Sequence, residues 1–179
     1  MNWIIAVPEI ALGVLGIAIL MFGVLARRHA ALFCNMFVLG ALLIAALLTI
    51  IMPGGTGYHG LFVVDTFSRF VDLLMLCGAA LSLILSFDYN RQEGITQFEF
   101  PVLILFAVVG MMVMISAANL MTLYLGLELQ LIALYVVTAF HRGSIRSSEA
   151  ALKYFILGAL ASGLLLYGIS LVYGFTGSM

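Results

Sequence analysis

Long apolar stretches separated by short polar connections dominate the pattern of the chain. Six such stretches can be recognised, each close to the roughly 20 residues that an α-helix needs to cross the hydrocarbon core of a membrane. They cover residues 3–25, 31–52, 65–87, 98–117, 119–140 and 147–173. The connections are too short to form a soluble domain, so residues 1–179 are expected to form a single transmembrane domain. The pattern therefore predicts an all-α membrane protein, a bundle of about six transmembrane helices.

The basic residues between the expected helices predict how the bundle lies in the membrane. Arginines occur in the first, third and fifth connections, whereas the second and fourth connections contain no lysine or arginine. These arginines are Arg27, Arg28, Arg91, Arg142 and Arg146. Because basic residues are enriched in cytoplasmic connections, both ends of the chain are expected on the outer, periplasmic side.

Composition excludes the soluble classes of function. Apolar residues make up 65% of the chain and charged residues 8%, with a mean hydropathy of +1.26. The net charge of -1 removes the case for a nucleic-acid partner. Cys34 and Cys77 lie in apolar stretches and are expected to be small core residues, and the histidines are too dispersed to form a metal site. No cofactor-binding motif is present, so neither a cofactor nor a metal is expected on this chain.

Glu128 is an ionisable residue in the middle of an apolar stretch. It lies in the apolar stretch 119–140, on the order of 14 to 18 Å from either end at the rise of an α-helix. A carboxylate at that depth loses its hydration and is rare unless it lines an ion path or has a partner. Two interpretations follow: a proton relay, which we favour, or a structural carboxyl bonded to a neighbouring helix, for instance to a tyrosine. Tyr124, four residues earlier on the same helical face, and Gln130 are its polar neighbours.

Glu149 and Lys153 form a second candidate pair, near the start of the sixth stretch. Their i,i+4 spacing favours an ion pair, and the glutamate suits the positive end of the helix dipole. Ser147 or Ser148 is expected to cap that helix. Lys153 can either extend its ammonium group to water or act as the next proton station, and the residues leave both interpretations open. Lys153 is expected about 10 Å nearer the membrane surface than Glu128, too far for a direct ion pair.

The other charged residues within the apolar stretches favour structural roles. Asp65, Arg69 and Asp72 share one helical face and are expected to neutralise one another. Glu9 is expected in a first helical turn near the outer surface. Glu99 opens the fourth stretch on the cytoplasmic side, where an interface carboxylate is one of two open interpretations.

Small residues recur four apart on the sixth stretch. Gly158 and Ser162 lie about one turn apart on a common face. This spacing permits close contact with a neighbouring helix, and we expect packing there in preference to a ligand groove.

Four segments of the sequence resemble a known family. One runs from Asn119 through Leu-Tyr-Leu-Gly-Leu-Glu128-Leu-Gln130, and another reads Ser148-Glu-Ala-Ala-Leu-Lys153-Tyr-Phe. The others are Pro8-Glu-Ile-Ala-Leu-Gly and Val63-Val-Asp-Thr-Phe-Ser-Arg-Phe70. Together they resemble the antiporter-like subunits of respiratory complex I, the bacterial proton-translocating NADH:quinone oxidoreductase, and among these the N-type subunit.

The resemblance implies roles for both candidate residues. Glu128 matches the fifth-helix glutamate of the family's lateral proton path, and Lys153 matches the sixth-helix lysine. In the family this glutamate pairs with a lysine on a broken seventh helix, and two inverted helical repeats complete the fold. Residues 1–179 therefore match the first part of the antiporter-like subunit fold, and they do not include the helix that carries the partner lysine.

The same resemblance implies a function, partners and a location. The chain is expected to be a membrane-arm subunit that takes part in proton translocation, coupled to NADH oxidation and quinone reduction on other subunits. Flavin mononucleotide and iron–sulfur clusters are expected on partner subunits, and other antiporter-like and small membrane subunits are the expected neighbours in the bacterial inner membrane. A non-catalytic scaffold, a cation/proton antiporter subunit and a membrane-bound hydrogenase subunit remain alternatives.

Overall fold

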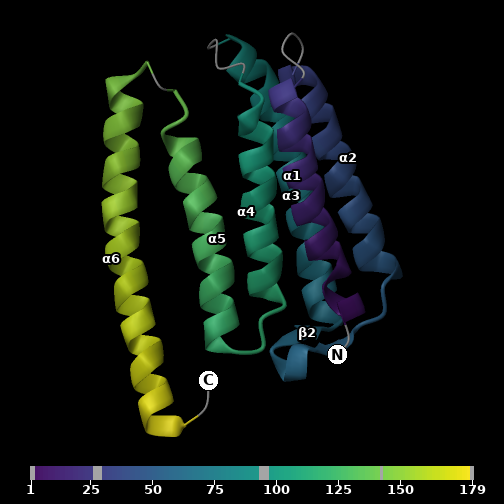
Figure 1. Ribbon diagram of the computed structural model, residues 1–179, viewed down its shortest axis with the longest axis vertical. Helices are drawn as coiled ribbons and strands as arrows, with labels where there is room; N and C mark the ends of the chain where they lie inside the picture. The colour runs from purple at the N-terminus through teal and green to yellow at the C-terminus, as the bar shows by residue number, and fades with distance from the viewer. Residues whose placement is uncertain (1–2, 26–29, 93–96, 142, 178–179) are drawn as a thin grey trace.

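The computed structural model describes residues 3–25, 30–92, 97–141 and 143–177. In chain order its elements are η1 (Trp3–Ala6), α1 (Val7–Leu25), α2 (Ala30–Ile51), β1 (Gly55–Gly57), η2 (Tyr58–Gly60), β2 (Phe62–Val64), α3 (Thr66–Gln92), α4 (Glu99–Ile115), α5 (Leu120–Thr138) and α6 (Ile145–Thr176). The α-helices run up and down along one long axis, with α6 at one edge of the bundle (Figure 1).

The fold class expected from the sequence is confirmed, because five of the described helices are long and apolar enough to cross a membrane. The sixth, α4, is also apolar but has only 17 residues, about 26 Å of helix, so it is shorter than expected. α4 packs against α1, α2 and α3 as well as against α5. In contrast, α6 has 32 residues, about 48 Å, so it must tilt or extend beyond a hydrocarbon core of roughly 30 Å.

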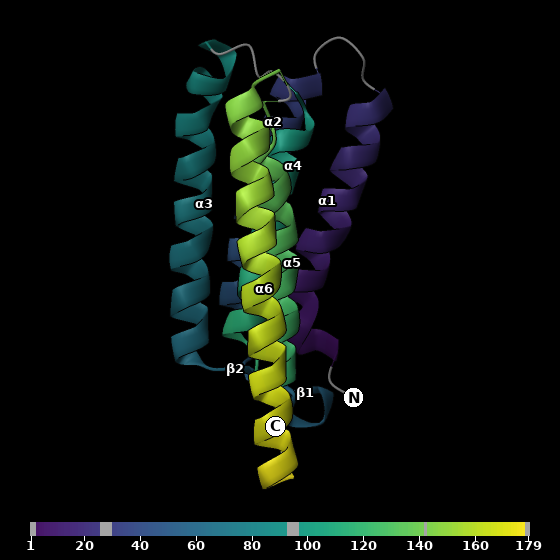
Figure 2. The ribbon, with the colours of Figure 1, turned by 90° about the vertical axis from the view of Figure 1, so that its left-hand side faces the viewer.

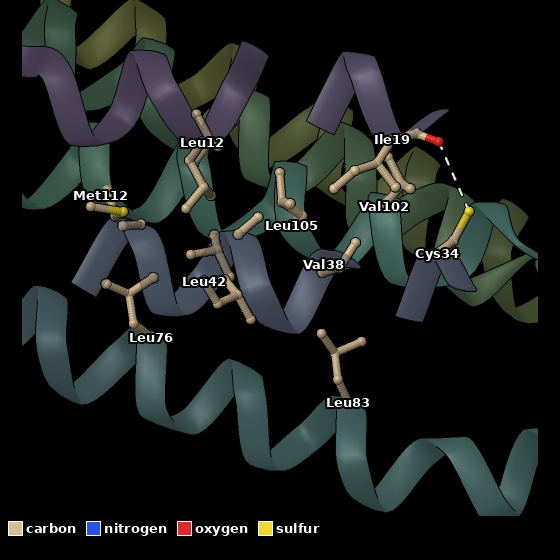
Figure 3. Close-up of a cluster of buried hydrophobic side chains, with 14 residues drawn as sticks. Leu12, Ile19, Cys34, Val38, Leu42, Leu76, Leu83, Val102, Leu105 and Met112 are labelled. Carbon is tan, nitrogen blue, oxygen red and sulfur yellow. Dashed lines mark hydrogen bonds between the residues drawn. The ribbon is translucent and has the colours of Figure 1, made fainter. Parts of the chain in front are cut away.

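The apolar core lies among α1, α2, α3 and α4 (Figure 3). Leu12, Val38, Leu105 and Met112 come from three of these helices, and each is fully buried. Around the outside, large apolar side chains are exposed along the helices. That arrangement fits a hydrocarbon solvent, since an apolar outer surface costs nothing in lipid.

α5 and α6 extend the bundle away from this core. α5 packs on α4, and α6 packs on α5. Viewed from the α6 side, α6 lies in front, with α1 and α3 on opposite sides of it (Figure 2). Most side chains of α6 are exposed, so one face of one neighbouring helix holds it in place.

A small β-hairpin occupies the connection between α2 and α3, where the sequence predicted only a loop. β1 and β2 pair antiparallel, with Gly55 opposite Val64. The hairpin binds the α4–α5 connection, because the Val63 amide donates to the Ser116 carbonyl at 2.9 Å and the Ala118 amide donates to the Leu61 carbonyl at 3.0 Å. It therefore closes one end of the bundle.

The arginines used for the orientation lie only partly within the described residues. Arg27, Arg28 and Arg142 lie outside them. Arg91 near the end of α3 and Arg146 near the start of α6 lie at the end of the bundle opposite the hairpin (Figure 1). These two arginines therefore share one end of the bundle.

Candidate functional site

Glu128 lies near the middle of α5. Asn119 begins this helix as its N-cap, because its side-chain oxygen accepts a hydrogen bond from the Thr122 amide at 2.7 Å. At the helical rise, Glu128 is about 12 Å from the Leu120 end of α5 and about 15 Å from the Thr138 end. The Glu128 side chain is half-buried against α6.

Glu128 is joined to two hydroxyl groups across the α5–α6 contact. The Ser162 hydroxyl on α6 donates to Glu128 Oε1. The Ser162 Oγ atom is also 2.9 Å from the hydroxyl of Tyr124. Because the single hydroxyl proton of Ser162 is used toward Glu128, Tyr124 must be the donor in the second bond.

This chain of hydroxyls has two possible directions. With Glu128 ionised, protons point from Tyr124 to Ser162 and from Ser162 to Glu128. With Glu128 protonated, its O–H can donate to Ser162, and Ser162 can then donate to Tyr124. The site can therefore accommodate both protonation states of the carboxyl without breaking its hydrogen bonds.

The contacts of Glu128 bear on one of its two interpretations, the carboxyl bonded to a neighbouring helix. The carboxyl does bond to a neighbouring helix, but the direct partner is a serine, and Tyr124 is one bond further away. Sequence reasoning missed Ser162 as a polar partner and assigned it only to packing. Its hydroxyl, set one turn from Gly158 on an otherwise apolar face, was the available signal.

Two glycines hold α5 close against α4 beside this site. A Cβ atom at Gly110 would lie 2.5 Å from the backbone nitrogen of Gln130, and a Cβ atom at Gly126 would lie 2.7 Å from the backbone nitrogen of Met114. The two helix backbones are therefore in direct contact at Gly126 and Gln130, two residues on either side of Glu128. This contact fixes the height of Glu128 against the core, and the sequence reasoning did not identify it.

Aromatic rings hold the other half of the α5–α6 contact. Gly158 packs against the ring of Tyr135, as expected for a small residue at a helix contact. Tyr135 also makes edge-to-face contacts with Tyr154 and Phe155, with ring centroids 5.0 and 5.4 Å apart. The hydroxyl of Ser147 donates to the Thr138 carbonyl at 2.7 Å, which ties the start of α6 to the end of α5.

Lys153 lies far from Glu128. Its Nζ atom forms the expected ion pair with Glu149 Oε1 at 2.5 Å, and the two side chains are 70% and 58% exposed. Ser162 marks the level of Glu128 on α6, and Lys153 lies about 14 Å from Ser162 along the helix. The separation is thus larger than the roughly 10 Å expected, and no direct ion pair joins the two residues.

The cap of α6 also differs from the expectation. Neither Ser147 nor Ser148 is the N-cap. Ser144 occupies that position, and its hydroxyl accepts from the Ser147 amide at 3.4 Å. Helix α6 begins earlier than expected because Ser144 supplies this acceptor.

The expected neutralisation among Asp65, Arg69 and Asp72 is wrong. Asp65 caps α3, since its carboxylate accepts from the Ser68 amide at 2.7 Å, and this bond lowers the pKa of Asp65. Arg69 Nη2 donates to the Met52 carbonyl at 2.5 Å, at the end of α2. Asp72 is 1% exposed, and its Oδ1 atom has no hydrogen-bond partner.

The expectations for Glu9, Glu99 and the two cysteines can also be compared with the structure. Glu9 is in the first turn of α1, as expected, and its side chain is buried. Glu99 begins α4 half-buried, with Oε2 unpartnered. Cys34 is a core residue as expected, but Cys77 is exposed, so that expectation is wrong for Cys77. Within the described part of the chain, no group of His, Cys, Asp and Glu side chains is arranged to hold a metal.

A helical bundle with apolar outer faces and a carboxyl near the middle of one spanning helix defines a class of protein. It is the class of polytopic membrane proteins that hold an ionisable group at depth, where such groups mark ion paths and proton relays. The hydroxyl partners of Glu128 place the site between two helices and away from both helix ends.

Comparisons with known proteins narrow this class. Residues 117–179 match the family model described as NADH:quinone oxidoreductase/Mrp antiporter, TM. The whole chain is 57% identical over 180 aligned positions to a protein of Granulibacter bethesdensis named NADH-quinone oxidoreductase subunit N. It is 49% identical over 180 positions to the protein of the same name from Gluconacetobacter diazotrophicus. The chain spans about 38% of the length of each of these relatives.

Solved structures agree with the sequence comparisons. A chain in the structure titled respiratory complex I from Thermus thermophilus with bound Aureothin is 32% identical, with a TM-score of 0.79. The match covers 96% of this chain and 37% of that one. A chain of an archaeal membrane-bound sulfane sulfur reductase, at 21% identity and a TM-score of 0.74, shares the fold. The resemblance to the N-type subunit is therefore confirmed: the chain is homologous over its length to the N-terminal part of proteins named NADH-quinone oxidoreductase subunit N.

Proposed function

We propose that this chain is the N-terminal part of a membrane-arm subunit of an NADH:quinone oxidoreductase and takes part in proton translocation. NADH oxidation and quinone reduction take place on other subunits. The observation that carries the proposal is the chain from Tyr124 through Ser162 to Glu128, because it places an acid with reversible hydroxyl partners near the middle of a spanning helix. The named relatives support the same function.

In this proposal Glu128 is the group that takes up and releases a proton. Its hydroxyl partners stabilise either protonation state, so the proton can leave without a large rearrangement of the α5–α6 contact. The glycine contact with α4 keeps the carboxyl at a fixed depth. A basic group from outside residues 1–179 is the expected partner that accepts the proton.

Lys153 is the second proton station in this proposal. It lies about 12 Å into α6 from Ile145, at the end of the bundle that also carries Arg146. Its ion pair with Glu149 holds the ammonium at that depth. Since about 14 Å of helix separates Lys153 from Ser162, water molecules or side chains of other helices must carry the proton between them.

We also propose neighbouring subunits for this chain, redox cofactors on other subunits and an orientation in the membrane. Other antiporter-like and small membrane subunits are the proposed neighbours, and the exposed faces of α6 offer the surface for them. Flavin mononucleotide and iron–sulfur clusters are proposed on partner subunits. The chain itself is proposed to hold no redox centre, and the hairpin end is proposed to face the periplasm of a bacterial inner membrane.

The experiment replaces Glu128 by Gln in the full-length subunit and follows NADH-driven proton uptake into inverted membrane vesicles. Assembly is checked by the flavin and iron–sulfur absorbance of the purified complex. We expect assembly to be preserved and proton uptake to be lost or strongly reduced. The matched control is Asp88→Asn, an exposed carboxylate on α3 away from Glu128, which we expect to leave uptake unchanged. Normal uptake in fully assembled Glu128→Gln complexes would overturn the proposal.

A cation/proton antiporter subunit is the second candidate function. It is favoured by one observation, that the family model matched by residues 117–179 covers Mrp antiporters as well as the oxidoreductase. The two candidates differ in what drives transport. Sodium-driven proton movement in vesicles without NADH would support the antiporter, whereas proton movement that requires NADH would support the oxidoreductase.

A further inference from the structure

A second pair of acids lies at the hairpin end of the bundle, far from Glu128 in the sequence. Glu9 on α1 is 5% exposed and Asp72 on α3 is 1% exposed. Both line one small cavity of about 10 Å³, together with Thr49 on α2. A polar cavity of that size is about large enough for one water molecule.

Three oxygen atoms at this place have no hydrogen-bond partner. They are Glu9 Oε2, Asp72 Oδ1 and Ser116 Oγ. Ser116 follows α4, is 1% exposed and lies beside the Glu9 carboxyl. Because buried polar atoms in folded proteins are nearly always paired, the unpartnered oxygens of Glu9 and Asp72, two residues that line one cavity, point to a bound proton or water that satisfies them.

No cation within the described residues neutralises the two acids. Among the side chains that the structure describes, the one ion pair of 4.0 Å or less joins Lys153 to Glu149, elsewhere in the bundle. Arg69, the nearest arginine along α3, donates to the Met52 carbonyl instead.

The remaining groups around the acids are equally unable to balance two negative charges. Asp65 is bonded to Ser68 at the start of α3, and the Thr49 hydroxyl donates to the Ala45 carbonyl at 2.9 Å. Tyr58 and Thr122 line a groove that Glu9 also lines, and His59 lies in η2 and lines neither this groove nor the small cavity. Two ionised carboxylates that line one cavity in an apolar interior are unfavourable, so this arrangement favours a proton on one of them.

Glu9 also borders a larger opening. The groove has a volume of about 430 Å³ and is lined by Glu9, Tyr58, Leu61 and Phe62 among others, so it joins the acid to the hairpin. At the helical rise, Glu9 is about 8 Å from the start of its spanning segment at Ile4, and Asp72 is about 9 Å from the start of α3. The pair is therefore inside the apolar layer but within reach of one surface.

We propose that Glu9 and Asp72 form a second proton-binding site, in which the two carboxyl groups share one proton at the hairpin end of the bundle. The shared cavity holds one water molecule that bridges the two carboxyl groups. The groove beside Glu9 is the route by which the proton exchanges with the aqueous phase at that end. The site does not involve Glu128, so its test can fail while the proposed function remains supported, and the reverse is also true.

Infrared spectroscopy of the full-length protein in its assembled complex tests the site, because protonated carboxyl groups have a C=O stretching band separate from that of carboxylates. The wild type is compared with Glu9→Gln, Asp72→Asn and the double variant across a pH titration. At neutral pH we expect the double variant to lose a signal equal to one protonated carboxyl per chain. In each single variant the remaining acid loses its like-charged neighbour, so its band should disappear at a lower pH than in the wild type.

The proposal would be overturned if the double variant lost no signal, or if it lost the signal of two carboxyl groups. It would also be overturned if the band of the single variants titrated as it does in the wild type. Asp88→Asn, which removes an exposed acid from the opposite end of α3, should leave the band unchanged. If the amide variants fail to assemble, Glu9→Asp keeps both carboxyl groups and changes their spacing. The band should then shift, and an unshifted band in Glu9→Asp would equally refute the shared proton.

Discussion

The hydroxyl of Ser162 on α6 donates a hydrogen bond to the carboxyl of Glu128 on α5, near the middle of α5. The same face of α6 also meets α5 at Gly158, which lies about one turn from Ser162 and packs against Tyr135. It also connects the acid to the hydroxyl of Tyr124. The consequences of this relationship can be tested residue by residue.

Replacing Ser162 by Ala should weaken both function and stability. The change leaves the half-buried Glu128 and Tyr124 without their common partner, and an unsatisfied polar group costs up to about 1–3 kcal/mol when it is fully buried, so a smaller cost is expected here. We expect proton uptake driven by NADH to fall several-fold while the complex still assembles. Ser170→Ala is the matched control, since Ser170 is an exposed serine of the same helix. Equal uptake in the two variants would show that Ser162 only packs.

Replacing Gly126 by Ala should separate α4 from α5. The new Cβ atom would lie 2.7 Å from the Met114 nitrogen and 2.8 Å from the Gly110 oxygen, and both are backbone atoms that cannot rotate away. Overpacking of this kind typically costs about 1–3 kcal/mol. The melting temperature of the purified protein measures the effect.

Gly78→Ala is the control for this glycine contact. A Cβ atom at Gly78 meets nothing within 4 Å, and alanine in a helix is favoured over glycine by up to about 1 kcal/mol. We therefore expect Gly78→Ala to keep or raise the melting temperature. Equal destabilisation by the two substitutions would contradict the close α4–α5 contact.

Two substitutions of Lys153 distinguish a proton station from a structural ion pair. Lys153→Arg keeps the charge beside Glu149 but places there a group that does not release its proton. If Lys153 carries protons, NADH-driven uptake should fall in Lys153→Arg as well as in Lys153→Gln. Both should change the free energy of unfolding by less than about 1 kcal/mol, as is usual for exposed pairs. Full uptake in Lys153→Arg would leave Lys153 with a structural role only.

The cap of α3 should make stability depend on acidic pH. The Ser68 amide donates to the Asp65 carboxylate and lowers the pKa of Asp65 below its ordinary value of 3.8. The ionised cap therefore stabilises the folded protein at pH values above 3.8, and this contribution is lost as the pH falls through the lowered pKa. Melting temperatures of the wild type and Asp65→Asn, measured from neutral to acidic pH, should converge as the pH falls. A difference independent of pH would exclude this role for Asp65.

The depth of Glu128 could be predicted from the sequence because the length of an apolar stretch fixes where its middle lies. The partner of Glu128 could not be predicted. α5 and α6 are apolar on nearly every face, so periodicity does not say which side of α6 turns toward α5. Ser162 is therefore read from the sequence as one more small residue, and its role depends on the rotation of α6.

The acids and the arginine of α3 show a different limit. The spacing of Asp65, Arg69 and Asp72, four and then three residues apart, predicts mutual pairing, but spacing reports only neighbours on the same helix. Arg69 instead satisfies a carbonyl at the end of α2, where the last turn of a helix leaves carbonyls without partners. Asp72 then remains buried beside Glu9. The hairpin was missed for a related reason, because strands of three residues carry too little pattern to predict.

The most direct measurement of the central claim is an infrared difference spectrum between resting and turning-over complex. We predict that a carboxyl C=O band changes during NADH oxidation in the wild type, and that this change is absent in Glu128→Gln although the variant complex assembles. The same change in wild type and Glu128→Gln would contradict the claim that Glu128 takes up and releases the translocated proton.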